Sequence, residues 1–257
     1  MIKRVILFLI LFLMGSQILY GGELKPAPAK SVQWLVASVG NTAYKQGDYA
    51  VAIEQYEEVL NNGFENGALY FNLGNSYYRK GELGKAILNY ERARKFLPRD
   101  SDLNFNYHYA LSQVKNGREK TSLNFLERFL EGLGRFYSTD EMATILTILF
   151  ILLGLGYLFS LYLKWTVRIR RLTLILLGTL FVVYGVGMVY KIKGEKHAAI
   201  ILKESPVKFE PREEATTYFE LAEGEKIKIV KEEELWVKVK RGDGKLGWTK
   251  KESLEKI

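Results

Sequence analysis

Two stretches decide the fold. Residues 33–64 read QWLVASVGNTAYKQGDYAVAIEQYEEVLNNGF, and residues 67–98 read GALYFNLGNSYYRKGELGKAILNYERARKFLP. Nine residues recur at a spacing of 34, and a fixed spacing in one register indicates an internal duplication. The identical pairs are Leu35/Leu69, Gly40/Gly74, Asn41/Asn75, Tyr44/Tyr78, Gly47/Gly81, Ala52/Ala86, Ile53/Ile87, Tyr56/Tyr90 and Glu57/Glu91.

Each copy has the pattern of two crossing helices. Small residues at Ala52 and Ala86 allow two helices to approach closely, and a Gly-acidic pair at Gly47 and at Gly81 predicts the turn between them. A 34-residue unit with Gly at position 8, Ala at 20 and Tyr at 24 resembles the tetratricopeptide repeat, although Phe64 replaces the closing Pro of the first unit.

The resemblance implies an all-α tetratricopeptide solenoid over residues 31–118, with units at 33–66 and 67–100. Two units bury too little surface, so residues 101–112 are expected to form a capping helix or a degenerate third unit.

The resemblance also implies that the first helix of each unit lines a concave groove. Two carboxamides and two cations beside aromatic rings are able to hold a peptide backbone or its terminal carboxylate. The alternative is that these side chains mainly pack and the groove is a general protein-docking surface. The candidate residues are Trp34, Asn41, Tyr44, Lys45, Phe71, Asn75, Tyr78 and Arg79.

Two uncharged stretches follow, at residues 142–163 and 172–190, and each is long enough for a transmembrane helix. The four cations of residues 164–171 predict a cytoplasmic loop between them. Residues 1–22, with Lys3 and Arg4 before an apolar core, predict a signal peptide or an N-terminal anchor. Together these signals place the flanking domains on the exterior, periplasmic side of a bacterial inner membrane, in a multi-pass protein.

Residues 119–141 form a juxtamembrane segment with apolar residues near helical spacing. An amphipathic helix on the membrane surface and a final helix of the solenoid are both compatible with this pattern.

Residues 198–257 change to a two-residue alternation that predicts strands. The ordered set Pro211, Trp236-Val-Lys-Val239 and Asp243-Gly-Lys-Leu-Gly247-Trp248 resembles the bacterial SH3 domain. This resemblance implies a small all-β SH3-like barrel of about five strands and cell-wall or peptide ligands. Trp236 and Trp248 are either its ligand face or part of its packing.

Composition argues against catalysis. The chain has no Cys, which excludes a disulfide framework and a thiol nucleophile, and its two histidines, His108 and His197, are far apart in sequence. We therefore assign no catalytic, cofactor-binding or metal-binding residue. Six of the eight net positive charges lie in residues 1–22 and 142–190, so the basic balance reflects topology and predicts no nucleic-acid partner.

The order of these modules resembles the BatE-like proteins of bacterial aerotolerance (Bat) operons, helped by the run Pro98-Arg-Asp-Ser-Asp-Leu-Asn-Phe-Asn106. The resemblance implies a non-enzymatic scaffold in an envelope complex linked to stress tolerance. It also implies von Willebrand A-type Bat membrane proteins and a MoxR-type ATPase as partners. The alternative is a wall-tethering protein whose SH3 domain binds peptidoglycan.

Overall fold

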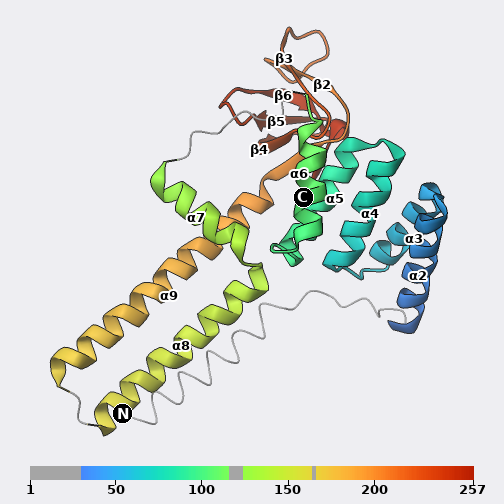
Figure 1. Ribbon diagram of the computed structural model, residues 1–257. Helices are drawn as coiled ribbons and strands as arrows, with labels where there is room; N and C mark the ends of the chain where they lie inside the picture. The colour runs from blue at the N-terminus through green and yellow to red at the C-terminus, as the bar shows by residue number, and fades with distance from the viewer. Residues whose placement is uncertain (1–29, 116–123, 164–165) are drawn as a thin grey trace.

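The computed structural model describes residues 30–115, 124–163 and 166–257, and the side chains of residues 30–36 lie outside that description. The predicted signal peptide or anchor at residues 1–22 also lies outside it. Figure 1 shows three parts: a helical solenoid, a pair of long helices, and a C-terminal sheet.

The solenoid consists of two antiparallel helix pairs, α2 (Lys30–Gln46) with α3 (Tyr49–Asn61) and α4 (Gly67–Lys80) with α5 (Leu83–Phe96). The turns adopt left-handed backbone at Gly47 (φ 84°) and Gly81 (φ 86°). Gly40 and Gly74 allow the close crossing, because a Cβ at either position would lie 2.7 Å from the ring of Tyr56 or Tyr90.

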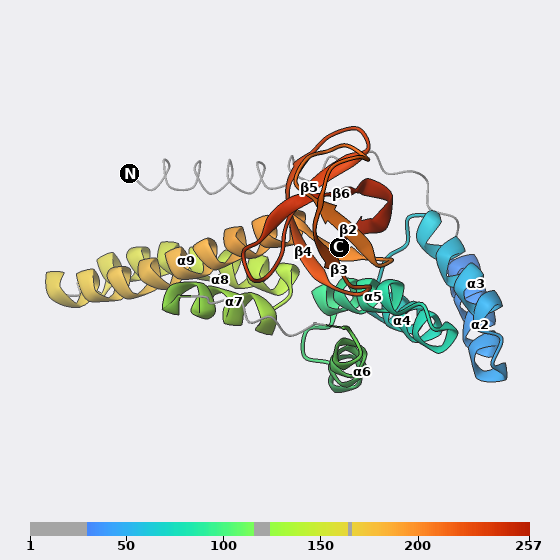
Figure 2. The same cartoon turned by 90° about the horizontal axis from the view of Figure 1, so that it is seen from above.

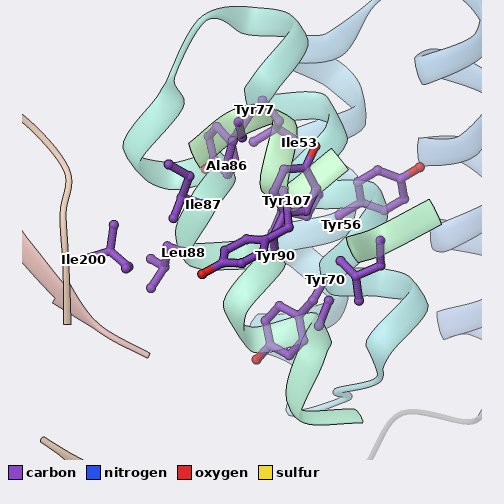
Figure 3. Packing of buried hydrophobic residues seen from close by; sticks show 14 of the residues in the cluster. Ile53, Tyr56, Tyr70, Tyr77, Ala86, Ile87, Leu88, Tyr90, Tyr107 and Ile200 are labelled. Carbon is purple, nitrogen blue, oxygen red and sulfur yellow. The ribbon is translucent and has the colours of Figure 1, made fainter. Parts of the chain in front are cut away.

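A fifth helix, α6 (Ser101–Ser112), packs on α5 and continues the series. Asp100 caps it by accepting a hydrogen bond from the Leu103 N–H at 2.8 Å. Figure 3 shows the core around α5, in which the buried Tyr56, Tyr90 and Ile87 pack together and Ile200 approaches from the sheet. The solenoid core therefore extends into the C-terminal domain.

Two apolar helices, α8 (Thr139–Tyr162) and α9 (Val167–Lys196), form a hairpin. Both are long and apolar enough to cross a membrane, each with a mean hydropathy of 2.3 over its most apolar window. Within the predicted cytoplasmic loop at residues 164–171, helix α9 already begins at Val167. Arginine is a good helix former, so α9 begins before the apolar stretch of residues 172–190 and includes Arg168, Arg170 and Arg171.

The juxtamembrane helix α7 (Phe125–Phe136) packs on α9, where Leu133 contacts Gly187. The Lys191 ammonium of α9 donates to the Tyr137 carbonyl at 2.6 Å. Figure 1 shows α7 crossing α9 steeply, away from the solenoid. Leu133 therefore joins α7 to the hairpin, and α7 contributes no residue to the solenoid core, which contradicts the alternative of a final solenoid helix.

Arg99, in the loop after α5, joins the solenoid to the hairpin. Its guanidinium donates to the Phe136 carbonyl at 3.3 Å and to the Glu141 carboxylate, and it lies 5.3 Å from the centre of the Phe136 ring. One side chain thus contacts α7 and α8 at the point where they meet.

The C-terminal domain is a seven-stranded antiparallel sheet with strand order β3-β2-β6-β5-β4-β1-β7. Alternate side chains on its strands, such as Val237 and Val239, form the domain core. The strands are β1 (Ala198–Ile201), β2 (Ser205–Lys208), β3 (Thr217–Leu221), β4 (Lys226–Glu232), β5 (Trp236–Lys240), β6 (Leu246–Lys250) and β7 (Leu254–Lys256).

The predicted small barrel of about five strands is instead a seven-stranded sheet that does not close. Within residues 198–257, all of which are described, β3 and β7 end the strand order and no ladder joins them. The β7 edge instead faces the solenoid, where Arg92 donates to the Lys256 carbonyl at 2.9 Å and pairs with Glu255 at 2.7 Å. The solenoid satisfies an edge that barrel closure would otherwise cover.

The sheet covers the side of α5 that a second helix of a third unit would cover in a longer solenoid. The Glu223 carboxylate accepts from the Gly84 N–H at 2.8 Å and so caps the first turn of α5, whose own N-cap residue, Glu82, makes no side-chain cap. A Cβ at Gly84 would lie 2.6 Å from the Ile201 carbonyl oxygen, so only glycine permits this approach. Figure 2 shows the sheet above α5, at the end of α9.

A buried carboxylate paired with a half-exposed lysine completes this junction. The Glu91 carboxylate, 7% exposed, accepts from the Tyr107 hydroxyl at 2.5 Å and from the Lys226 ammonium at 2.9 Å. Burial alone would raise the pKa of Glu91, but Lys226 and Arg94, with the hydroxyl bond, outweigh it and lower that pKa to about 2. The carboxylate therefore stays ionised between the two domains.

Candidate functional site

The groove is built by α2, α4 and α6, which contact one another in that order. Asn41 and Asn75 occupy equivalent positions on α2 and α4, and Asn106 lies on α6. Lys45 follows Asn41 by four residues, which places both on one face of α2. Trp34 lies on α2, but its side chain is outside the described part of the chain.

Asn41 links the first unit to the second. Its Oδ1 accepts from the Tyr56 hydroxyl at 2.6 Å and from the Asn72 amide at 3.0 Å. Burial, with a smaller contribution from Tyr44, raises the pKa of Tyr56 to about 12, so this hydroxyl remains a donor at neutral pH. The predicted ligand-binding residue Asn41 thus also connects the first unit to the second through hydrogen bonds.

The same arrangement recurs 34 residues later. The Oδ1 of Asn75 accepts from the Tyr90 hydroxyl at 2.8 Å and from the Asn106 amide at 2.9 Å. Among the hydrogen bonds between described residues, none uses the Nδ2 of Asn41 or Asn75 as donor. Each asparagine therefore fixes the fold through its oxygen and offers its two N–H groups to a ligand.

Three candidate residues of the first unit, Asn41, Tyr44 and Lys45, share one cavity of about 300 Å³. Lys45 is exposed and brings a positive charge to the lining of this cavity. The lining residues are Asn41, Tyr44, Lys45, Tyr56 and Asn72.

The candidates of the second unit are more dispersed. The Arg79 guanidinium lies 5.2 Å from the centre of the Tyr49 ring, so it bridges back to the first unit. Tyr78 accepts a hydrogen bond from the Gln113 amide, and Phe71 packs beside Tyr90 with ring centres 6.1 Å apart. Lys45 and Asn41 line the same cavity. Among the described residues, no lysine or arginine shares a cavity or a hydrogen bond with Asn75 in the same way.

Sequence reasoning missed the α6 end of the groove. Phe105 is 71% exposed and stacks on Tyr109, which in turn meets the ring of Tyr78 edge-on. The repeat itself carried the signal, because Leu69, Phe71 and Asn72 recur at a spacing of 34 as Leu103, Phe105 and Asn106. An exposed aromatic pair at this end gives the groove an apolar contact surface beside its amides.

A second cavity, of about 670 Å³, lies on the opposite side of the solenoid between α3 and α5. Tyr70 and Tyr77 line its base, and Glu255 and Ile257 of the chain end border it. Burial first, then a hydrogen bond with Glu65, raises the pKa of Tyr70 to about 12. The cavity belongs to the junction between the solenoid and the sheet.

The predicted SH3 ligand residues lie on one outer face of the sheet. Trp248 is only 8% exposed, because Lys231 and Lys238 lie over its ring with ammonium groups 5.8 Å from the ring centre. Trp236 is half-buried beneath Lys208 at 5.7 Å. Both rings lie on the same face of the sheet, and lysine side chains cover Trp248 more fully than Trp236.

Among the residues that the structure describes, no cluster of three or more His, Cys, Asp or Glu residues occurs. His197 follows α9 directly, and the Lys193 carbonyl accepts a hydrogen bond from its Nδ1 at 2.8 Å.

Comparison with known families supports the first part of the fold. Residues 40–101 match the tetratricopeptide repeat family, a range that covers most of the solenoid. The match supports protein–protein interaction as the general role of this domain. A search of the curated proteins finds no match to the chain.

Proposed function

We propose that this protein is a non-enzymatic scaffold of a bacterial inner membrane, which captures an extended segment of a protein partner in its concave groove. The observation that carries the proposal is the repeated asparagine arrangement, which orients two pairs of amide donors 34 residues apart along one face. Backbone carbonyls of an extended peptide accept from such donors, and Lys45 attracts a carboxylate of the same segment.

The α6 end adds the apolar part of recognition. Phe105 and Tyr109 are exposed there, so the proposed segment carries an apolar or aromatic side chain at this end. Its acidic group then lies at the other end, near Lys45.

In the proposed setting, α8 and α9 cross the membrane and the solenoid and sheet face the periplasm. The sheet serves as an SH3-like module, and the partners belong to a Bat-type envelope complex with von Willebrand A-type membrane proteins. The four cations of residues 164–171 support this orientation, because such charges favour the cytoplasmic side.

The test is affinity capture of the full chain from bacterial membranes in mild detergent, followed by mass spectrometry. The variant Lys45→Glu/Phe105→Ser alters both ends of the groove and leaves the structural ties intact. Its matched control is Lys203→Glu/Phe209→Ser, which makes the same changes at exposed positions in the segments that flank β2. Loss of a partner with the groove variant alone supports the proposal, and equal recovery with both variants refutes it.

The competing wall-tethering function would use Trp236 and Trp248 on purified peptidoglycan. Pelleting of the detergent-solubilised full chain with cell wall tests it. Retention that Trp236→Ala abolishes and the groove variant preserves would favour tethering over capture.

A further inference from the structure

The outer face of the sheet carries an uncompensated positive charge. On β5, Lys238 and Lys240 point outward, while the alternate residues Val237 and Val239 are fully buried. Across the ladder from β4, Lys228 lies directly opposite Lys240 and Lys231 directly opposite Lys238. Like charges in directly opposed positions destabilise a sheet, so the fold bears a cost here.

Counter-ions within the protein cover only part of this face. Glu233 pairs with Lys231 at 3.0 Å, and Glu213 pairs with Lys250 at 2.8 Å and Lys208 at 3.7 Å. Among the ion pairs of the described residues, none involves Lys228, Lys238 or Lys240. These three lysines form what we call the basic face.

The register of the sheet places the basic face beside the end of α9. The helix ends at Lys196, β1 begins at Ala198, and Ala198 pairs with Lys228. Because neighbouring strands are about 5 Å apart, Lys228 and Lys240 lie about 5 and 10 Å from the chain as it leaves the helix. Ala198 follows Tyr190, the last residue of the uncharged stretch, by eight residues, so at 1.5 Å per helical residue the face begins about 12 Å beyond the proposed membrane span.

An exposed apolar surface lies on α7, closer to the proposed membrane span. Phe125, Leu126 and Phe129 of α7 are exposed on a helix that crosses α9 near Gly187, and the capping box of α7 begins at Asn124. Figure 1 shows α7 crossing α9 below the sheet. Apolar rings in the interface and lysines above them match the layering of a lipid surface.

We propose that the basic face binds the phosphate headgroups of anionic phospholipids in the membrane that α8 and α9 cross. The inference rests on the membrane placement in the proposed function and is independent of partner capture. Phosphate oxygens between Lys228, Lys238 and Lys240 turn the repulsion across β4 and β5 into attraction.

The test uses the full chain in nanodiscs of phosphatidylcholine, alone or with phosphatidylglycerol, and measures lysine acetylation site by site. A lysine at an anionic surface gains about 1 kcal/mol, so Lys238 and Lys240 are expected to react about fivefold more slowly in the anionic discs. High salt removes this protection. Lys203, exposed between β1 and β2, is the internal control and is expected to react equally in both.

The variant Lys240→Glu separates binding from a structural role. It replaces a repulsive pair by an attractive one, so it is expected to raise the melting temperature in zwitterionic discs and to abolish the protection of Lys238 in anionic discs. Equal reactivity of Lys238 and Lys240 in both kinds of disc would overturn the inference and leave partner capture intact. Protection by soluble polyphosphate with none from phosphatidylglycerol would overturn lipid as the occupant, and failure of the chain to enter discs would overturn the membrane placement itself.

Discussion

Glu91→Gln tests the junction between the solenoid and the sheet. The substitution keeps the shape of the side chain but removes the charge that faces Lys226. The pKa of Glu91 falls from 4.5 to about 2 on folding, and each pKa unit corresponds to 1.36 kcal/mol, so the ionised carboxylate stabilises the folded chain by about 3 kcal/mol. We expect the variant to lose roughly this amount at pH 7.

The pH dependence gives the sharper readout. Because folding lowers the pKa, the stabilisation is present in full above the unfolded value of 4.5 and disappears as the pH falls towards 2. The free-energy difference between the wild type and Glu91→Gln is therefore expected to shrink from pH 5 to pH 3. Denaturant unfolding of the full chain in detergent, followed by circular dichroism, measures this difference at each pH.

A neighbouring pair supplies the control. Glu255 contacts Arg92 at 2.7 Å across the same junction, but its side chain is 47% exposed. An exposed ion pair contributes at most about 1 kcal/mol, so Glu255→Gln is expected to have a small effect. If Glu91→Gln were no more destabilising than Glu255→Gln at pH 7, or if its effect did not change with pH, the Glu91–Lys226 pair would not stabilise the junction between the solenoid and the sheet.

Three other predictions concern the groove, the junction and the topology. Asn75→Ala leaves the Tyr90 hydroxyl without its acceptor and is expected to destabilise the chain by about 1–3 kcal/mol in the same assay, so an unchanged midpoint would contradict the tie between units. Gly84→Ala forces a Cβ against the β1 backbone and is expected to cost about 1–3 kcal/mol, and hydrogen exchange that rises in both α5 and the sheet would locate the loss at their junction. Single cysteines at Asn61 and Lys245 are expected to react with an impermeant maleimide in spheroplasts while one at Val167 does not; the reverse pattern would invert the topology.

The solenoid was predictable because its information is local and repeated. The spacing of 34 residues is visible in the sequence. Gly74 recurs at this spacing because the helix lies so close to the Tyr90 ring that a larger residue would not fit. The role of Asn41 and Asn75 was only half predictable. Their positions on the groove follow from the repeat, but the tyrosine and asparagine that occupy each oxygen come from other helices.

The junction was not predictable for a physical reason. Glu91 and Lys226 are 135 residues apart, and Glu91 has the same residue type as its repeat counterpart Glu57. Glu57 is half-buried and bonds the Tyr77 hydroxyl, whereas Glu91 becomes fully enclosed because the sheet lies on α5. Only the docking of two domains distinguishes the two carboxylates. The open sheet has the same origin, since its β7 edge is satisfied by Arg92 of the solenoid.

The contacts of α5 and its following loop determine how the groove can act. The sheet covers α5 from Gly84 to Arg92, and Arg99 contacts the junction of α7 and α8. The solenoid therefore contacts the sheet along α5 and the hairpin through Arg99, and two separate sets of contacts restrict its movement more than one set would. In the proposed function this rigidity lowers the entropy lost when a partner in the same membrane docks, because the groove already has a fixed height and direction. Glu91→Gln would then weaken the capture of a membrane-embedded partner more than the capture of the same segment as a free peptide. A hinged solenoid would lose both equally or neither.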